Sequence, residues 1–440
     1  MKKILVIRFS SIGDIVLTTP VIRCLKKQIQ DAEIHVLTKK KFANLYKTNP
    51  HIDKVYEYDD SLKKNIEELK LENYDYVVDL QKNKRSVRVT RALGRPHASF
   101  PKLNFRKFLL STFKIDIMPD VHIVDRYFKA VEKLNVRNDF YGLDFFISDK
   151  NNFPISELPE EFQNGYYAFV IGGTYKTKIL PPVKIAEVLK KINKPVILLG
   201  GPDDVERAEE IISLVNGQRT TDNGDINSQI QKDFQVFRFS DSQIQKYSQI
   251  FRFSDSQIQK YSQIFRFSDF QIQKDSQVFR FSDSQIQKDS QVFRFSDSQI
   301  QKDSQVFRFS DSQIQKDSQI FRFSDSQILN LVGKINLEQS ASIVKNADSV
   351  LTNDTGLMHI AAAFHKNIVS VWGNTVPELG MYPYLPKEPE KCHIIECKDV
   401  RCRPCSKLGF KECPKKHFRC MMEIDTDRVA ESIILKKHCL

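Results

Sequence analysis

Residues 3–29 read KILVIRFSSIGDIVLTTPVIRCLKKQI, and this stretch decides the fold. Its start, Lys3–Arg8, carries a continuous apolar run, which is typical of a β-strand buried on both faces. We expect a helix over Ile15–Ile29. A strand that leads directly into a helix is the first half of a parallel βαβ unit.

The alternation of strands and helices continues along the chain. In the first half we expect strands at 34–38, 55–58 and 76–80, and helices at 62–69 and 124–134. A linker at 138–163 follows, and the pattern restarts with strands at 167–171, 196–199, 328–332, 349–352 and 368–372 and helices at 183–192, 205–215, 337–346 and 356–364. The simplest α/β architecture is two Rossmann-like domains that face a cleft. We assign residues 1–150 to the first domain, 165–227 and 328–421 to the second, and 422–440 to a C-terminal helix.

A tandem repeat interrupts the second domain. The sequence FRFSDSQIQK begins at Phe237 and returns, nearly unchanged, every 14 residues through Phe321. Its composition is rich in Ser, Gln and Asp and sparse in apolar residues, which favours disorder over a packed core. Stacked strands or a helix are the alternatives. We therefore treat 228–327 as an insertion, expected to be disordered, in a helix-to-strand loop.

Composition limits the classes of function. The 440 residues are 41% hydrophobic and 28% charged, with no apolar run near the roughly 18 residues of a membrane span. The apolar start ends at Arg8 without a signal-peptide cleavage site, so we expect a cytoplasmic protein. The net charge of +12 suits an anionic substrate, a phosphate-bearing partner or an acidic membrane surface.

Three strand-to-helix junctions carry side chains that can bind a ligand or take part in catalysis. In such sheets, ligands bind beyond the carboxyl ends of the strands. The first junction holds Ser10, Ser11, Gly13 and Asp14, where Asp14 is either a helix cap or a general base. No G-x-G-x-x-G motif is present, so a dinucleotide cofactor is not expected.

The second junction, Ile171–Lys178, offers Gly173, Thr174 and Lys178. Glycines, hydroxyls and lysines at a strand end suit a diphosphate, although an ordinary polar loop has the same composition.

The third junction contains Asp354, Thr355, Gly356 and His359. Backbone amides at Thr355 and Gly356 can hold a phosphate at the start of the helix. His359 either faces the cleft or belongs to the core. Together the three junctions indicate a phosphate-bearing donor in the second domain and an acceptor in the first.

The residues of these junctions resemble a known family. Ile4–Pro20 is similar to the opening motif, and Asn353–Ala363 to the donor-site motif, of the ADP-heptose:lipopolysaccharide heptosyltransferases, glycosyltransferase family 9. Residues 371–374 and 76–81 also fit. The resemblance implies a GT-B fold and an inverting glycosyltransferase, and it covers the chain except about 228–328.

The resemblance also implies roles for individual residues. Asp14 corresponds to the family's proposed catalytic base, and Lys178 to a lysine that contacts the donor phosphate. Asp354, Thr355 and Gly356 correspond to residues around the donor diphosphate and sugar, and Asp203 to an acid that contacts the adenosine ribose. From the junctions themselves we expect Ser10, Ser11 and Gly13 to be acceptor contacts, and Gly173, Thr174 and His359 to be further donor contacts.

The resemblance also implies the reaction and its partners. It implies that the donor is an ADP-sugar with a heptose-like sugar and that the acceptor is the lipid A-linked core of lipopolysaccharide. We expect peripheral contact with the inner face of the cytoplasmic membrane, no required cofactor and no nucleic-acid partner. The alternatives are a transferase-like scaffold without turnover and a zinc- or nucleic-acid-binding protein.

The last alternative rests on six cysteines between Cys392 and Cys420. Four of them offer a tetrahedral zinc set, namely Cys402, Cys405, Cys413 and Cys420. Their spacing is not that of a zinc ribbon. Structural thiols and a structural zinc therefore both remain open.

Overall fold

The structure is a computed structural model, and it describes residues 2–58, 61–192, 194–216 and 328–434. The predicted disorder of 228–327 lies outside the described residues, as does the end of the predicted helix at 422–440. Among the described residues, no helix is long and apolar enough to cross a membrane.

The first sheet has five parallel strands in the order β3-β2-β1-β4-β5. They are β1 (Lys2–Ile7), β2 (Ala32–Lys39), β3 (Lys54–Tyr58), β4 (Tyr76–Asp79) and β5 (His97–Ser99). The chain reverses direction across the sheet between β1 and β4. In sheets of this kind the ligand site lies beyond the carboxyl ends of the strands at that reversal.

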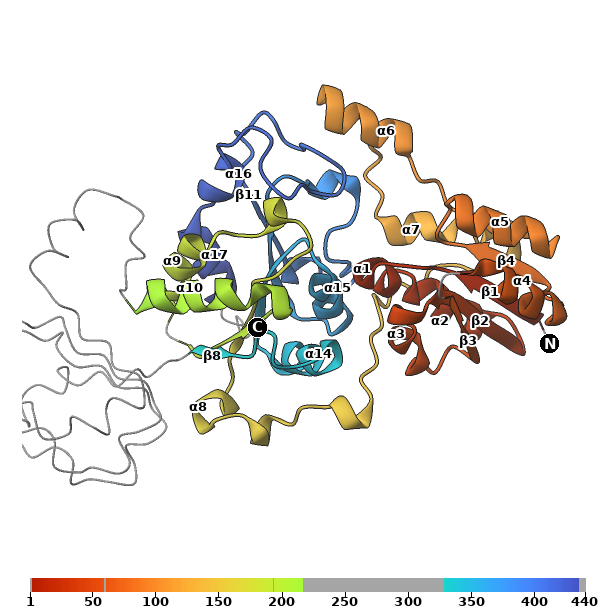
Figure 1. Cartoon of the computed structure of the whole chain (residues 1–440), viewed down its shortest axis with the longest axis horizontal. Helices are drawn as coiled ribbons and strands as arrows, with labels where there is room; N and C mark the ends of the chain where they lie inside the picture. The colour runs from red at the N-terminus through yellow and green to blue at the C-terminus, as the bar shows by residue number, and fades with distance from the viewer. Residues whose placement is uncertain (1, 59–60, 193, 217–327, 435–440) are drawn as a thin grey trace, which may run out of the picture. The chain divides into compact units, whose positions relative to one another are not determined.

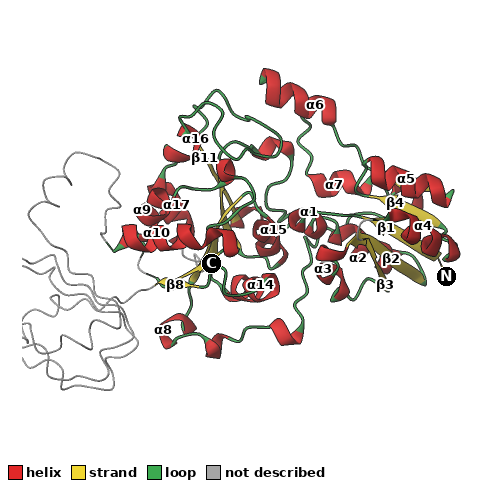
Figure 2. Ribbon diagram, in the orientation of Figure 1, coloured by secondary structure: helices red, strands yellow, loops and turns green. Residues whose placement is uncertain are grey.

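Helices cover both faces of this sheet (Figure 2). Ile4 and Val6 of β1 pack in one core with α2 (Thr19–Gln28). Leu5 and Ile7 point the other way, into a core with α4 (Leu62–Leu71) and α5 (Lys84–Leu93). Since successive strand residues face opposite sides, the uninterrupted apolar run of β1 is explained by this double coverage.

The helix predicted at Ile15–Ile29 is divided in the structure. α1 spans Ile12–Val16, and α2 begins at Thr19. Pro20 has no N–H to donate to the carbonyl of Val16, and the hydroxyl of Thr19 donates to that carbonyl at 2.8 Å. The earlier start at Ile12 places Asp14 in the first turn of α1.

The second sheet has six parallel strands in the order β11-β10-β9-β6-β7-β8. They are β6 (Tyr167–Val170), β7 (Val196–Leu199), β8 (Ile328–Asn330), β9 (Ser349–Asn353), β10 (Asn367–Trp372) and β11 (Cys392–Glu396). One face packs on α9 (Pro182–Leu189), α10 (Val205–Val215) and α17 (Thr426–Ile434), the other on α14 (Leu337–Asn346) and α15 (Gly356–Ala363). The predicted fold class of two parallel α/β domains is confirmed.

The remaining helices are short. They are α3 (Asn44–Lys47), α6 (Asn104–Phe108), α7 (Ile123–Phe128), α8 (Glu160–Gln163) and α16 (Arg419–Met422), and Figure 1 labels them along the chain. The helix predicted at Val124–Leu134 is therefore shorter, because the chain changes to a tighter turn after Phe128. There the amides bond carbonyls three residues back, as in Val131 to Phe128 at 3.0 Å.

The insertion interrupts a regular βαβ unit. β7 pairs in parallel with β8, and α10 connects the two strands as far as Val215. Ile328 pairs with Val196, the first residue of β7. The insertion therefore lies between the end of α10 and the start of β8, the strand that pairs with β7.

We expect a variant that lacks 228–327 to fold and to keep its activity, because β7 pairs with β8 and α10 packs in one core with α9. Thermal unfolding should give a midpoint within about 5 °C of the full chain, as for a surface change of about 1 kcal/mol or less. An aggregated or unfolded product would show that the insertion takes part in the fold.

Candidate active site

The first and third junctions meet at two glycines. A Cβ placed on Gly13 of α1 would lie 2.6 Å from Cδ2 of His359 in α15. A Cβ on Gly356, at the start of α15, would lie 2.8 Å from Cγ2 of Ile12 and 3.3 Å from the amide nitrogen of Gly13. The starts of the two helices are therefore in contact, and only glycine fits at these positions without displacing a neighbour.

Asp14 accepts bonds from two sides. Its Oδ2 accepts from the amide and the hydroxyl of Ser11, at 3.2 and 2.9 Å, and its Oδ1 lies 2.7 Å from Nη2 of Arg8. Burial favours the neutral acid, but the Arg8 charge and the Ser11 bonds outweigh it and hold the pKa of Asp14 below its ordinary value. The carboxylate is thus ionised at neutral pH and can accept a proton. It also caps α1, so the cap and the base are compatible; the base remains a prediction.

Arg8 is a site residue that the sequence analysis did not identify. It is buried, and its guanidinium donates to the carbonyl oxygens of Ser10 (2.9 Å) and Leu80 (2.6 Å) and to the hydroxyl of Tyr127 (3.1 Å). These hydrogen bonds hold the Arg8 guanidinium in position beside the carboxylate of Asp14. The signal in the sequence was a cation at the end of an otherwise apolar strand.

More positive charge surrounds Asp14. Arg126 is buried; its Nη2 donates to the carbonyl of Leu379 at 3.0 Å, while Nε and Nη1 have no hydrogen-bond partner in the described part of the chain. Burial and the charge of Arg126 lower the pKa of Lys107 to about 8, although Asp14 opposes the shift. Burial and Arg8 likewise lower the pKa of Lys102. Such a group of cations can receive an anion.

The second junction lies against the third. Nζ of Lys178 pairs with Oδ2 of Asp354 at 2.5 Å, and the hydroxyl of Thr375 donates to the same oxygen at 2.9 Å. A Cβ on Gly173 would lie 3.3 Å from Cγ2 of Thr355, while Thr174 is exposed. The structure therefore brings Gly173, Lys178, Asp354 and Thr355 together at the start of α15, where backbone amides lack helical partners.

Asn353 links the second and third junctions, and the sequence analysis did not identify it as a site residue either. Its buried side chain accepts from the amide of Leu180 at 3.0 Å and donates to the carbonyls of Val170 (3.2 Å) and Gly172 (3.4 Å). It thus joins the end of β9 to both sides of the 171–178 loop. An amide side chain can do this because it carries a donor and an acceptor.

His359 lies in the core rather than in an open site. It is 2% exposed, and its Nδ1 has no partner among the described residues. Burial lowers its pKa to about 4, against the opposing charges of Asp354 and Asp14, so the imidazole is neutral. Its contact with Gly13 makes it a spacer between α1 and α15. A direct donor contact remains a prediction.

The acid that approaches the glycine loop is Asp204. A Cβ on Gly172 would lie only 1.9 Å from Oδ2 of Asp204. Asp204 is buried, accepts from the amide of Gly201 at 2.9 Å and pairs with Arg207. Asp203, the predicted ribose contact, is exposed to solvent next to it.

In the described structure the predicted zinc ligands are neighbours but do not form a closed set. Cys402, Cys405, Cys413 and Cys420 are free thiols, and they form no group of three or more ligand atoms within 4.8 Å of one another. Burial and the neighbouring thiols raise the pKa of Cys405 to about 11 and of Cys420 to about 12. Sγ of Cys402 also lies 3.7 Å from Nε2 of His417, so structural thiols and a structural zinc both stay predictions. The tail also contacts the 171–178 loop, where Thr177 donates its hydroxyl to the carbonyl of Phe410 at 3.0 Å.

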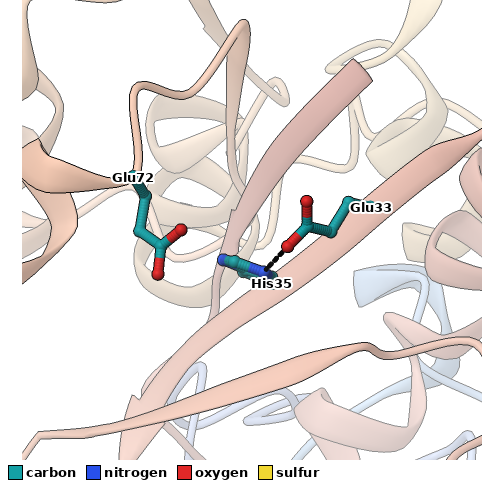
Figure 3. A group of neighbouring side chains, drawn as sticks. All are labelled: Glu33, His35 and Glu72. Atoms are coloured by element: carbon teal, nitrogen blue, oxygen red, sulfur yellow. Dashed lines mark hydrogen bonds and ion pairs between the residues drawn. The ribbon is translucent and has the colours of Figure 1, made fainter. Parts of the chain in front are cut away.

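One group of potential ligands does converge, namely Glu33, His35 and Glu72 (Figure 3). Nε2 of His35 lies 2.8 Å from Glu33, and Nδ1 lies 2.9 Å from the hydroxyl of Tyr74. Glu72 pairs with the ammonium groups of Lys3 and Lys54, both at 2.7 Å. Two lysines therefore balance the two carboxylates, and the group is explained as a network that joins β1, β2 and β3.

Comparisons with known proteins agree with this geometry. The family model described as glycosyltransferase family 9 (heptosyltransferase) matches residues 62–227 and 219–411. A lipopolysaccharide heptosyltransferase 1 from Campylobacter coli is 30% identical over 239 residues, which are 48% of this chain and 68% of that protein. A lipooligosaccharide heptosyltransferase 2 from Haemophilus influenzae is 40% identical over 67 residues, 15% of this chain and 18% of that protein.

Two solved structures share the fold. The ADP-heptose lipopolysaccharide heptosyltransferase II of E. coli superposes with a TM-score of 0.56 at 17% identity, covering 98% of this chain and 97% of that one. A family 9 glycosyltransferase from Veillonella parvula gives 0.50 at 18% identity, covering 90% and 85%.

Proposed function

Because the chain belongs to glycosyltransferase family 9 and is a glycosyltransferase, we propose that it moves a heptose from ADP-heptose to the lipid A-linked core of lipopolysaccharide. The observation that carries this proposal is the contact between the starts of α1 and α15. It places the carboxylate of Asp14 beside the loops that suit a diphosphate.

The donor site would consist of Lys178 and the start of α15. Lys178 carries the positive charge, and the amides after Thr355 point out of the helix end, where the helix dipole favours an anion. Asp354 holds the ammonium of Lys178 in the absence of donor. Gly173 lets the loop lie close to this helix end, because a Cβ there would lie 3.3 Å from Cγ2 of Thr355.

The reaction would be a single displacement. An acceptor hydroxyl attacks the anomeric carbon of the donor sugar while its proton passes to Asp14. The bond from that carbon to the phosphate oxygen breaks, and its electron pair leaves with ADP. Lys178 and the amides of α15 stabilise the charge that develops on the diphosphate. One carboxylate suffices because no covalent sugar–enzyme intermediate forms, so the anomeric configuration inverts.

The acceptor would be anionic and bound at the inner face of the membrane. Lys102 and Lys107 place positive charge near Asp14, Arg126 adds charge near Lys107, and two donor atoms of Arg126 lack a partner in the described chain. Phosphate or carboxylate groups on the acceptor would supply those partners. This charge is the reason for preferring an acidic glycan over a neutral one.

The test is product analysis with purified protein. We expect ADP-heptose and a heptose-deficient lipopolysaccharide to give ADP and an acceptor heavier by one heptose, in equal amounts. ADP-glucose and UDP-glucose serve as control donors. If ADP-heptose binds but no sugar moves to any acceptor, the scaffold alternative is correct. If it does not bind, the donor assignment is wrong.

The pKa of Lys107 predicts a pH dependence. In the free enzyme the ammonium loses its proton above about pH 8, so binding of an anionic acceptor should weaken as the pH rises from 7 to 9.5. We expect kcat/KM for the acceptor to fall about tenfold over this range, since kcat/KM reports the free enzyme. The control is Lys107→Arg, which stays charged and should flatten the profile. An unchanged profile would show that Lys107 does not meet the acceptor.

A further inference from the structure

Exposed apolar side chains are concentrated in one stretch of the first domain. Between residues 105 and 121, which we call the apolar segment, six large side chains are between 42% and 70% exposed: Phe105, Phe108, Phe113, Ile115, Ile117 and Val121. Elsewhere in the described chain such residues are scattered. Isolated exposed apolar residues are ordinary, whereas a contiguous set marks an interaction surface.

The apolar segment is held in place from its other side. Leu110 is buried with Val376 and Leu379 in a small core, and Met118 packs against it. Nζ of Lys114 donates to the carbonyl oxygens of Ser111 (2.7 Å) and Pro404 (2.6 Å). The exposure of the phenylalanines is therefore a feature of a packed segment, and α6 stands clear of the first sheet in Figure 1.

The bond from Lys114 to Pro404 joins the segment to the tail, three residues before a second exposed strip. In this strip, residues 407–411, Leu408 is 63% and Phe410 38% exposed. Lys407 and Lys411 flank them and are also exposed. Within the apolar segment, Arg106 and Lys114 are exposed cations, beside the exposed acids Asp116 and Asp120. The combined surface is apolar with an excess of positive charge.

We propose that the apolar segment and the strip 407–411 form the surface by which the protein lies on a bilayer of anionic phospholipids. The inference rests on the proposed function, since a lipid-linked acceptor must be reached at a membrane. Aromatic and aliphatic side chains mixed with cations match the apolar interior and the negative surface of such a bilayer. A surface that binds a protein partner would instead be expected to contain a groove or acidic side chains held in fixed positions.

The placement of Lys107 strengthens the proposal. Lys107 belongs to α6 like Phe105 and Phe108, but it is half-buried whereas the two phenylalanines are exposed. One side of α6 therefore packs against the protein, while the phenylalanines face solvent.

Vesicle binding tests the surface without turnover. Sedimentation with phosphatidylcholine vesicles containing about 30% phosphatidylglycerol should bind the full chain. The double variant Phe105→Ser/Phe113→Ser should bind at least tenfold more weakly, because it loses the free energy gained when two phenylalanine side chains move from water into the bilayer. The matched control is Leu71→Ser on α4, an 82% exposed side chain outside the surface, which should bind like the wild type. Lys407→Glu/Lys411→Glu should lose the preference for anionic vesicles.

A second measurement separates this surface from the catalytic proposal. With a water-soluble acceptor that lacks acyl chains, the Phe105→Ser/Phe113→Ser variant should transfer sugar at the wild-type rate and unfold at the same temperature. Unimpaired vesicle binding by this variant overturns the surface. The proposal is also overturned if the wild type is a dimer, the variant is a monomer, and vesicle binding persists. In that case the surface binds a second copy of the chain. Vesicle binding without transfer to any acceptor would instead overturn the proposed function alone.

Discussion

Replacement of Asp14 by Asn should lower kcat by about 10² to 10⁴, the contribution typical of a positioned general base. The asparagine oxygen can still accept the bonds of Ser11, so the start of α1 should survive. The amide cannot take a proton from the acceptor. The measurement is the single-turnover rate of sugar transfer from a preformed complex with the donor.

The same variant distinguishes a role of Asp14 as a general base from a role as a helix cap. If Asp14 only caps α1 and pairs with Arg8, the substitution changes the free energy of unfolding by about 1–2 kcal/mol and leaves the rate nearly intact. The measured affinity for ADP is the control, and we expect it to be unchanged because the donor loops lie in the second domain. A wild-type rate with reduced stability would leave Asp14 a purely structural role.

Replacement of Lys178 by Gln should reduce kcat/KM for the donor by about 10² to 10³, comparable with the loss of one donor group that stabilises developing charge. Lys178 is the partner of Asp354, and without it an uncompensated carboxylate would face the diphosphate. Binding of ADP, followed by calorimetry, should weaken together with the rate.

The matched control is Lys176→Gln on the same loop. Lys176 is exposed, and the change removes the same charge from the same turn. We expect an effect of less than about threefold, because a solvated charge contributes little. Equal losses in the two variants would mean that the loop acts only through its overall charge, and would contradict a specific role for Lys178.

Much of the site could be predicted from the order of strands and helices. Parallel strands place their carboxyl ends at one edge, so Asp14, Lys178 and Asp354 could be proposed from their positions after three separate strands. The family and the fold class are confirmed by the comparisons and by the two sheets. The contact between Lys178 and Asp354 follows from this rule, since β6 and β9 are neighbours.

Residues that act through distant partners could not be predicted in the same way. Arg8 bonds Leu80 and Tyr127, and Arg126 bonds Leu379, so their roles arise only when remote segments meet. The same is true of Asn353, whose partners lie in the 171–180 region. The local sequence contained only weak signals, a cation at the end of an apolar strand for Arg8 and a place in the donor-site motif for Asn353, and neither indicated these partners.

Local chemistry also corrected two predictions of helix length. Pro20 divides the helix that was expected at Ile15–Ile29, and the division was readable from the proline itself. No proline or other helix-breaking residue indicated that α7 would end at Phe128. The cysteine spacing, in contrast, left zinc and structural thiols open, because it does not determine whether four thiols converge in space.

The anomeric configuration of the transferred sugar tests the central claim most directly. A displacement assisted by Asp14 alone, with the donor held by Lys178 and the start of α15, requires inversion. Nuclear magnetic resonance of the product should therefore show a glycosidic linkage opposite in configuration to that of the sugar in ADP-heptose. Retention would require a covalent or otherwise two-step path with a second nucleophile, and would contradict the account.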